Sequence, residues 1–234
     1  MKKALLMLIC GSAAYIATAQ ESHPRNGVIL KAGYNSANVS VTSNGRVDDA
    51  KALSSFHVGF IGDLYLAKVL SFQAGLLFTG KGSKTQSGVQ SDANYYKATS
   101  NPLYVEIPAY LVLKFPLAAN ATVFAGAGPY LGIGVLGKNK VEGKVAGVAF
   151  QSKNDIQWSN DDPTTLSYEE GAGFGVMKRF DYGLNGTAGV EFDKLILGVN
   201  YGYGLAKLQS GSNSSSKDDS NKHRVWSFSI GFKM

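Results

Sequence analysis

The amino-acid sequence predicts an all-β protein: an eight-stranded antiparallel up-and-down transmembrane β-barrel with short periplasmic turns and long extracellular loops. Three observations lead to this prediction. Eight stretches alternate apolar and polar residues with a period of two, as strands with one apolar face do. The connections between these stretches are alternately long and short. Aromatic residues gather near both ends of the apolar face, as they do at the two interfaces of a membrane.

The alternation is clearest in two places. Residues 182–192 and 195–206 form a hairpin around a minimal turn at Asp193-Lys194, with large apolar residues on one face and small or polar residues on the other. Along residues 102–115, the apolar positions run in steps of two from Leu103 to Phe115. The same pattern places the remaining strands at residues 28–34, 56–66, 69–81, 121–135 and 223–232.

The connections show the asymmetry of an outer-membrane barrel. Three of them have only two to five residues. The other four are polar and rich in turn-forming residues, and we expect them to be long outer loops at about residues 35–55, 82–101, 137–179 and 209–222. Short turns lie on the periplasmic side of such barrels, and an even strand count places both chain ends there too.

The face opposite the apolar stripe carries charged residues. The bore of an eight-stranded barrel is just wide enough for side chains, so we expect a plugged lumen in which these charges pair. The predicted lumen network consists of Lys31, Asp63, Glu106, Lys114 and Glu191. The predicted aromatic girdles are Tyr34, Phe56, Phe78, Tyr182, Tyr203 and Trp226 toward the long loops, and Phe72, Phe115, Phe192 and Phe232 toward the short turns.

A secreted soluble barrel or sandwich is the main alternative for the fold. It would bury the apolar face as a core and explains the alternation equally well. It explains the aromatic placement, the strand lengths and the loop asymmetry less well. Outside the N-terminal segment no run of ~18 apolar residues occurs, so we expect no membrane-spanning helix.

The N-terminal segment predicts export to the cell outer membrane. We interpret residues 1–19 as a signal peptide and residues 20–234 as the barrel domain. Lys2-Lys3 precedes a mostly apolar stretch, and Ala17-Thr18-Ala19 fits the small-x-small cleavage rule. The single cysteine, Cys10, lies in this segment after Ile9, a poor lipobox residue. We therefore expect the mature chain to have neither a lipid anchor nor a disulfide.

Several short motifs on the strands are shared with a known family. They are residues 179–183 (RFDYG), 188–192 (AGVEF) and 200–205 (NYGYGL), with similar residues at 31–33, 56–60 and 104–108. Over essentially the whole mature chain, the sequence resembles the outer-membrane β-barrels common in Bacteroidota, the porin family or PorT-type barrels. Most members are uncharacterised, and one known role lies in a protein-secretion apparatus. Such barrels often end on an aromatic residue, whereas here Phe232 is followed by Lys233-Met234.

The sequence predicts no catalytic, cofactor or metal site. The three histidines are far apart, no cysteine remains, and the acidic residues of the third long loop lack EF-hand spacing. Two of the three histidines, His57 and His223, fall near the outer rim within reach of Ser54, Ser55 and Ser227 by register, which is the pattern that a lipid-modifying barrel enzyme would use. The third histidine is His23. The polar and acidic residues of the third long loop are Asp155, Asn160, Asp161 and Asp162.

We therefore expect a non-enzymatic outer-membrane protein without a cofactor, with a structural, adhesive or assembly role through its outer loops. Its expected partners are outer-membrane lipid and a protein at the outer loops, and we expect a monomer. The net charge of +6 is too mild and dispersed for nucleic acid. A narrow porin-like channel and a lipid-modifying enzyme are the alternatives.

The third long loop is the best place for a specific function. Residues 145–150 suggest that the predicted strands at 121–135 and 182–192 extend beyond the membrane as a hairpin. Trp158 is a large apolar group in a polar loop, which indicates a contact point or a local core.

The signal-peptide interpretation is tested by the N-terminus of the exported protein. Edman sequencing or intact mass should show a mature chain that begins at Gln20, because cleavage follows Ala19. A chain that retains residues 1–19 in the membrane fraction would show an uncleaved anchor instead.

Overall fold

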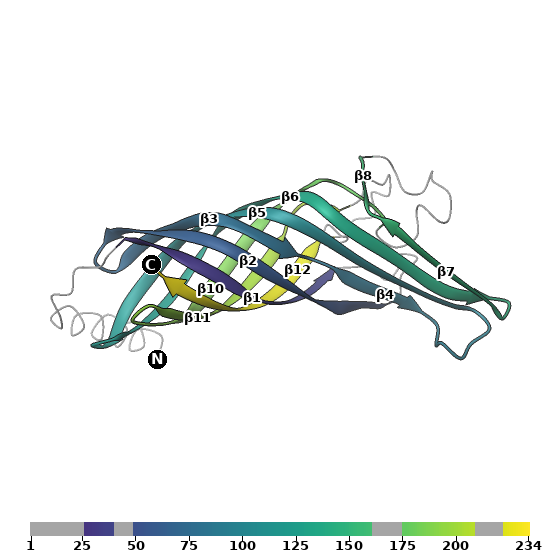
Figure 1. The fold of residues 1–234 in the computed structure, drawn as a ribbon, viewed down its shortest axis with the longest axis horizontal. Coiled ribbons are helices and arrows are strands. Elements are labelled where there is room, and N and C mark those ends of the chain that lie inside the picture. The colour runs from purple at the N-terminus through teal and green to yellow at the C-terminus, as the bar shows by residue number, and fades with distance from the viewer. Residues whose placement is uncertain (1–25, 40–48, 161–174, 209–221) are drawn as a thin grey trace, which may run out of the picture.

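The protein forms a closed ring of eight antiparallel strands (Figure 1). The computed structural model describes residues 26–39, 49–160, 175–208 and 222–234. Neighbours around the ring are consecutive barrel strands, and the last strand pairs with the first. The ring comprises β1 (Gly27–Val39), β2 (Asp49–Ala67), β3 (Leu70–Gly80), β5 (Tyr95–Ala118), β6 (Ala121–Val145), β10 (Phe180–Phe192), β11 (Leu195–Gly204) and β12 (His223–Lys233). This closed ring confirms the predicted fold class.

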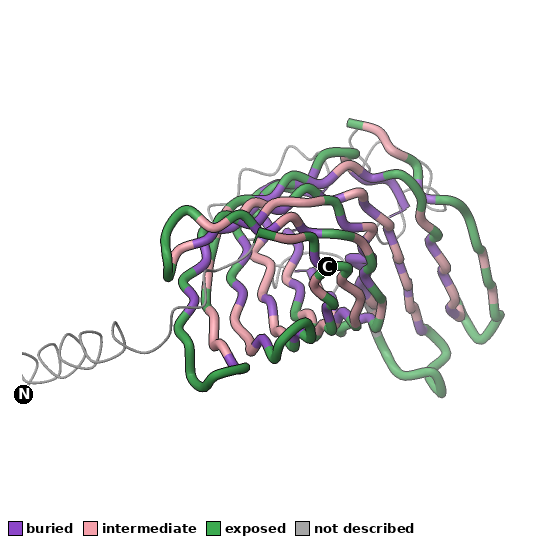
Figure 2. Tube along the Cα trace, turned by 60° about the vertical axis from the view of Figure 1, so that its left-hand side comes forward, coloured by how far each residue is buried: buried purple, intermediate pink, exposed green. Residues whose placement is uncertain are grey.

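Buried and exposed residues alternate along the barrel strands (Figure 2). The exposed positions are mostly apolar and the buried ones include many polar residues. On β5, the odd-numbered Leu111 and Leu113 are 56% and 47% exposed. The even-numbered Tyr104 and Lys114, which point to the other face of the strand, are almost fully buried. A soluble barrel would show the reverse, because its apolar face would form the core. Among the described residues, no helix is long and apolar enough to cross a membrane.

The predicted girdle residues lie on the exterior, with Phe78 and Tyr203 half-buried. Tyr34 is opposite Phe56 across the β1–β2 pair, and the rings of Phe56 and Phe78 lie 6.2 Å apart. Near the short turns, Phe232 is opposite Leu195, the residue that also pairs with Phe192. The remaining members are Phe72 and Phe115 toward the turns and Tyr182 and Trp226 toward the outer side, all exposed.

Two strands are far longer than a membrane crossing needs. β5 has 24 residues and β6 has 25. At ~3.3 Å per residue each spans about 80 Å, whereas a tilted strand crosses the apolar band in about 9–11 residues. Their outer halves join β4 (Ser83–Ser87), β7 (Val148–Asp155) and the start of β2 in a sheet beyond the ring, here called the outer extension (Figure 1).

The outer extension corrects the interpretation of three connections as loops. Residues 49–55, 83–87, 95–101, 137–145 and 148–155 are strands, and β1 continues to Val39. The sequence pattern missed them because both faces are largely polar, so the apolar period of two is weak there. A small cluster of Ala98 and Val141, packed with Tyr96 and Phe150, is their apolar contribution. The fourth predicted loop, 209–222, falls almost wholly outside the described residues.

The third connection contains the expected hairpin, with a different partner. β6 and β7 pair around Ala146-Gly147, whose φ angles of 49° and 81° are the positive values that a tight hairpin turn requires. The returning strand β7 is not the next barrel strand, β10. Between them, β8 (Gln157–Trp158) and β9 (Val176–Met177) form a short parallel pair.

A β-bulge on β6 separates the barrel from the outer extension. The register shifts so that Leu103 pairs with Leu136 and Tyr104 with Gly134, which leaves Val135 as the additional residue. Val135 and Leu136 are both exposed. Interior positions on β6 therefore have even numbers below the bulge, such as Tyr130, and odd numbers above it, such as Val141.

The exterior surface around Leu111 should not tolerate charge if it faces lipid. Leu111→Arg should lower the free energy of unfolding in phospholipid vesicles by about 2–4 kcal/mol, the cost of a cation near the bilayer midplane. Gln151→Arg on β7 of the outer extension is the matched control and should change it little. Urea titration with gel mobility as readout measures both, and equal costs would place the two positions in the same solvent.

Candidate functional site in the barrel interior

A four-charge cluster lies in the interior near the short turns. The Lys114 Nζ atom lies 2.6 Å from Asp63 Oδ2 and 3.0 Å from Glu191 Oε2. The Lys233 Nζ atom contacts the same carboxylates, at 2.7 Å and 3.4 Å. These residues come from β2, β5, β10 and β12, so the cluster joins strands across the bore. Two cations facing two carboxylates make it neutral, as a group buried in a membrane protein must be.

Neighbouring polar groups complete this inner cluster. Gln73 donates a hydrogen bond from Nε2 to Asp63 Oδ1 at 3.1 Å. The Tyr65 ring lies 4.8 Å from Lys114 Nζ and 5.0 Å from Lys233 Nζ, within cation–π distance of both ammonium groups. Asp63 is 2% exposed, so its charge is satisfied by protein groups.

A second cluster lies toward the outer mouth and is centred on Lys81. Its Nζ atom forms ion pairs with Glu106 and, at 2.8 Å, with Asp181 Oδ2. The Tyr130 hydroxyl donates to Asp181 Oδ2 at 3.1 Å, and the Tyr130 ring lies 3.8 Å from the ammonium group. Lys81 is 3% exposed and Asp181 is fully buried. Lys81 follows the end of β3, where the chain bends toward β4.

Hydrogen bonds occupy the level between the two clusters. Lys31 donates from Nζ to Asn200 Oδ1 at 3.0 Å, and Asn185 donates from Nδ2 to Glu106 Oε1 at 3.1 Å. Two interior cavities lie beside these groups, each of about 30 Å³. Such a volume holds about two water molecules.

An apolar cluster occupies the outer mouth above the Lys81 cluster. Val39, Ile156, Met177 and Leu208 are buried together, and Trp158 packs against them. The Trp158 ring meets the interior-facing Tyr104 ring edge-on at 5.6 Å. A Cβ atom on Gly134 would lie 2.3 Å from the Trp158 ring, so the tryptophan needs a glycine at this position. Trp158 is thus part of a local core.

The structure separates the five predicted lumen residues. Asp63, Lys114 and Glu191 meet in the inner cluster, Glu106 belongs to the Lys81 cluster, and Lys31 contacts Asn200. The sequence interpretation missed Lys81, Asp181 and Lys233. All three lie at strand ends and share the odd parity of the interior residues on their strands. Continuing each alternation by one or two residues would have found them.

Both described histidines are held in the interior by amide or phenol groups. His57 Nδ1 lies 2.7 Å from Asn35 Oδ1, and Asn35 donates in turn to Thr79 Oγ1. His223 Nε2 shares a hydrogen bond of 3.3 Å with the Tyr104 hydroxyl. Among the described residues, neither ring has a hydrogen bond to a serine or a carboxylate. His23 lies outside the described residues.

The other candidate residues are not brought together. Ser54 shares a hydrogen bond with the Tyr34 hydroxyl on the exterior. The buried hydroxyl of Ser55 has no hydrogen-bond partner among the described residues, and Ser227 lines one interior cavity. Asp155 is exposed 3.9 Å from Lys138, while Asp161 and Asp162 lie outside the described residues. Within the described ranges, no group of three histidine, cysteine or acidic residues could hold a metal ion.

Glu142, Lys97 and Lys140 form an ion-pair group on the outer extension, and the pKa values of Glu142 and Lys97 are shifted there. Hydrogen bonds from Lys140 and Lys97 lower the pKa of Glu142 below its usual value. The hydrogen bond to Glu142 raises the pKa of Lys97 in return. Glu142 therefore stays ionised at neutral pH, and its contribution to stability is lost as the pH falls through its lowered pKa.

Removing one cation from the inner cluster should be costly. Lys114→Met should lower the free energy of unfolding by about 3–5 kcal/mol, because Asp63 and Glu191 would share Lys233 alone. Lys97→Met, which breaks the half-exposed pair with Glu142, is the matched control and should cost below about 1 kcal/mol. Denaturant titration in the same detergent compares them, and equal losses would show that the interior pair is solvated.

Comparison with known proteins agrees with the closed ring of strands. A family model described as "Outer membrane protein beta-barrel domain" matches residues 18–210. No curated protein matches this chain. Among solved structures, the chain is similar to the attachment invasion locus protein Ail of Yersinia pestis at 14% identity and a TM-score of 0.39, covering 90% of this chain and 100% of Ail.

Two further solved structures are similar at the same level. Neisserial surface protein A has 14% identity and a TM-score of 0.38, with 90% of this chain and 99% of that protein covered. OprG from Pseudomonas aeruginosa has 13% identity and a TM-score of 0.36, with 91% and 97% covered. The family model spans most of the chain, and the strands form a closed ring with an apolar exterior. The chain therefore belongs to the outer membrane protein β-barrel domain family and is an outer-membrane β-barrel protein.

Proposed function

We propose that this protein is a non-enzymatic outer-membrane barrel with a plugged lumen, which acts structurally or as a binding protein through its outer parts. The observation that carries the proposal is the filled interior. Ion pairs join opposite strands at two levels, around Lys114 and around Lys81, and Trp158 packs with Tyr104 at the mouth. These contacts support a lumen without a continuous water path, which a conducting pore would need.

A narrow porin-like channel receives less support. The two cavities of about 30 Å³ hold about two waters each, which is too little for a hydrated solute. The interior charges face one another at 2.6–3.4 Å in the inner cluster, whereas a selectivity ring would direct them at a passing ion.

A lipid-modifying enzyme is also less well supported. Such an enzyme needs a base within hydrogen-bond reach of a nucleophile or a carboxylate, at a site that lipid can enter. His57 and His223 are 4% and 1% exposed, and their described partners are Asn35 and Tyr104.

The finer parts of the assignment rest on the sequence. The motifs at residues 179–183, 188–192 and 200–205 support a porin-family or PorT-type barrel of Bacteroidota, which leaves a role in secretion assembly open. Export through a cleaved signal peptide, a monomeric state and a protein partner at the outer side belong to the same proposal.

Planar-bilayer recording tests the plugged lumen. The protein should show no stable conductance steps, whereas a Tyr104→Ala/Tyr110→Ala/Tyr130→Ala variant should conduct, because it removes three rings from the bore. Tyr182→Ala on the exterior is the matched control and should stay silent. Large, stable conductance of the unaltered protein would refute the proposal.

A further inference from the structure

One face of the outer extension carries lysines on β4, β5, β6 and β7. It continues the exterior face of β5, whose apolar stripe ends at Leu103, and of β6, whose stripe ends at Leu136. The lysines are Lys84, Lys97, Lys138, Lys140, Lys144 and Lys153. Among the described side chains of these strands, Glu142 and Asp155 are the acidic groups on this face. The described side chains of this face therefore comprise six cations and two anions.

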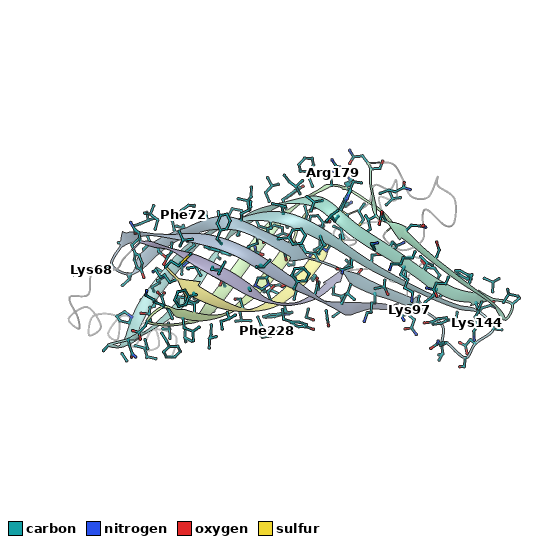
Figure 3. All side chains as sticks on the ribbon, viewed as in Figure 1. Lys68, Phe72, Lys97, Lys144, Arg179 and Phe228 are labelled. Atoms are coloured by element: carbon teal, nitrogen blue, oxygen red, sulfur yellow. The ribbon has the colours of Figure 1, made fainter. Side chains whose placement is uncertain are left out.

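The opposite face of the same strands is uncharged in the described residues. It contains the cluster of Ala98, Val141, Tyr96 and Phe150, together with serines and asparagines such as Ser100 and Asn139. The alternation of the strands thus sends the cations to the side that faces away from the barrel axis. Figure 3 shows Lys97 and Lys144 on the outer extension, at the far end of the molecule from Lys68 and Phe72.

Three of these lysines lie in one row across the sheet. Lys84 pairs with Thr99, Thr99 with Lys140, and Lys140 with Lys153. Adjacent strands are ~4.8 Å apart, so the row places three ammonium groups along about 15 Å. We call Lys84, Lys140 and Lys153 the lysine row.

The ammonium groups of the lysine row repel one another. Lys140 and Lys153 are directly opposite each other, an arrangement of like charges that destabilises a sheet. Lys140 shares Glu142 with Lys97, at 2.7 Å and 2.6 Å. Neither Lys84 nor Lys153 forms an ion pair with a described residue. An external anion at the row would relieve the repulsion that Glu142 compensates only in part.

The height of the row fits the headgroup layer of the outer leaflet. Lys138 lies two residues after Leu136, and Lys140 lies four residues after it. At ~3.3 Å per residue, Lys140 is about 13 Å from Leu136 along the strand. A tilt of ~40° reduces this to about 10 Å above the last apolar side chain. Lysine stems reach back toward the interface, so the ammonium groups lie where polar headgroups begin.

We propose that the lysine row, with Lys138 and Lys97 beside it, binds the phosphate groups of phosphorylated glycolipid in the outer leaflet. The row lies on the sheet face that is continuous with the lipid-facing exterior, which favours a membrane lipid over a soluble polyanion. Binding anchors the outer extension against the membrane surface and fixes its orientation. The inference deepens the proposed binding role and relies on the outer placement of the extension.

Titration with fluorescent lipopolysaccharide in neutral detergent tests this site. Lys84→Gln/Lys153→Gln should weaken binding about 25-fold, taking about fivefold for each lysine near an anionic surface. These two lysines form no ion pair with a described residue, so the substitution leaves Glu142 and its partners in place. Lys84→Arg/Lys153→Arg should retain binding. Lys68→Gln/Lys194→Gln in the short turns removes the same charge and should bind as the unaltered protein does.

Three results would overturn the assignment. The first is an equal loss of lipopolysaccharide affinity in Lys84→Gln/Lys153→Gln and in Lys68→Gln/Lys194→Gln. The second is that the unaltered protein binds dephosphorylated lipopolysaccharide as tightly as the phosphorylated form. The third is that the lysine row binds a soluble sulfated polysaccharide while the protein does not bind lipopolysaccharide. Heat-modifiable gel mobility checks that each variant is folded. A negative result in the lipopolysaccharide titration does not change the result expected from planar-bilayer recording, so failure of the lipid-binding proposal is distinguishable from failure of the plugged-lumen proposal.

Discussion

Closure of the hydrogen-bonded ring is the constraint on which this structure depends. In hydrocarbon, an unpaired backbone amide or carbonyl costs several kcal/mol, so a sheet can cross a membrane only without free edges. The register between β1 and β12, from Ile29 opposite Lys233 to Val39 opposite His223, removes the last two edges. Antiparallel neighbours then require only short turns on one side, such as Asp193-Lys194 between β10 and β11.

Closure with eight strands also determines the chemistry of the interior. The bore is so narrow that side chains from opposite strands meet, and a charge placed there finds either a partner or a large desolvation penalty. Lys114 and Lys81 each contact two carboxylates from different strands. Ion pairs across the bore thereby do what a hydrophobic core does in a soluble domain, while the apolar side chains remain on the exterior. Tyrosine rings such as Tyr65 and Tyr130 fill the space around the ammonium groups.

The sequence was sufficient for the ring because lipid and lumen impose opposite polarity on successive residues. Strands such as 182–192 and 195–206 were therefore placed within two residues of the bounds of β10 and β11. In the outer extension both faces of the sheet meet water, so successive residues do not differ in polarity. For this reason β4, β7 and residues 95–101 of β5 were predicted as loops. The interior partners of Glu106 could not be chosen from sequence, since pairing across the bore depends on strand order and stagger. Lys81 and Lys233 were missed because the predicted polar face was cut short at strand ends.

The bulge at Val135 and Leu136 has a consequence for how this molecule can change over time. It uncouples the numbering of the two halves of β6, so the barrel wall below and the sheet above obey separate rules of alternation. Substitutions above the bulge can change the outer extension without changing which residues of β6 face the lumen. Loss of the additional residue would remove the bulge and leave Lys138 and Lys140 on the exterior face, because Gly134 below it faces the interior and Leu136 above it faces the exterior. The joint can therefore lose one residue without exchanging the two faces of the outer extension.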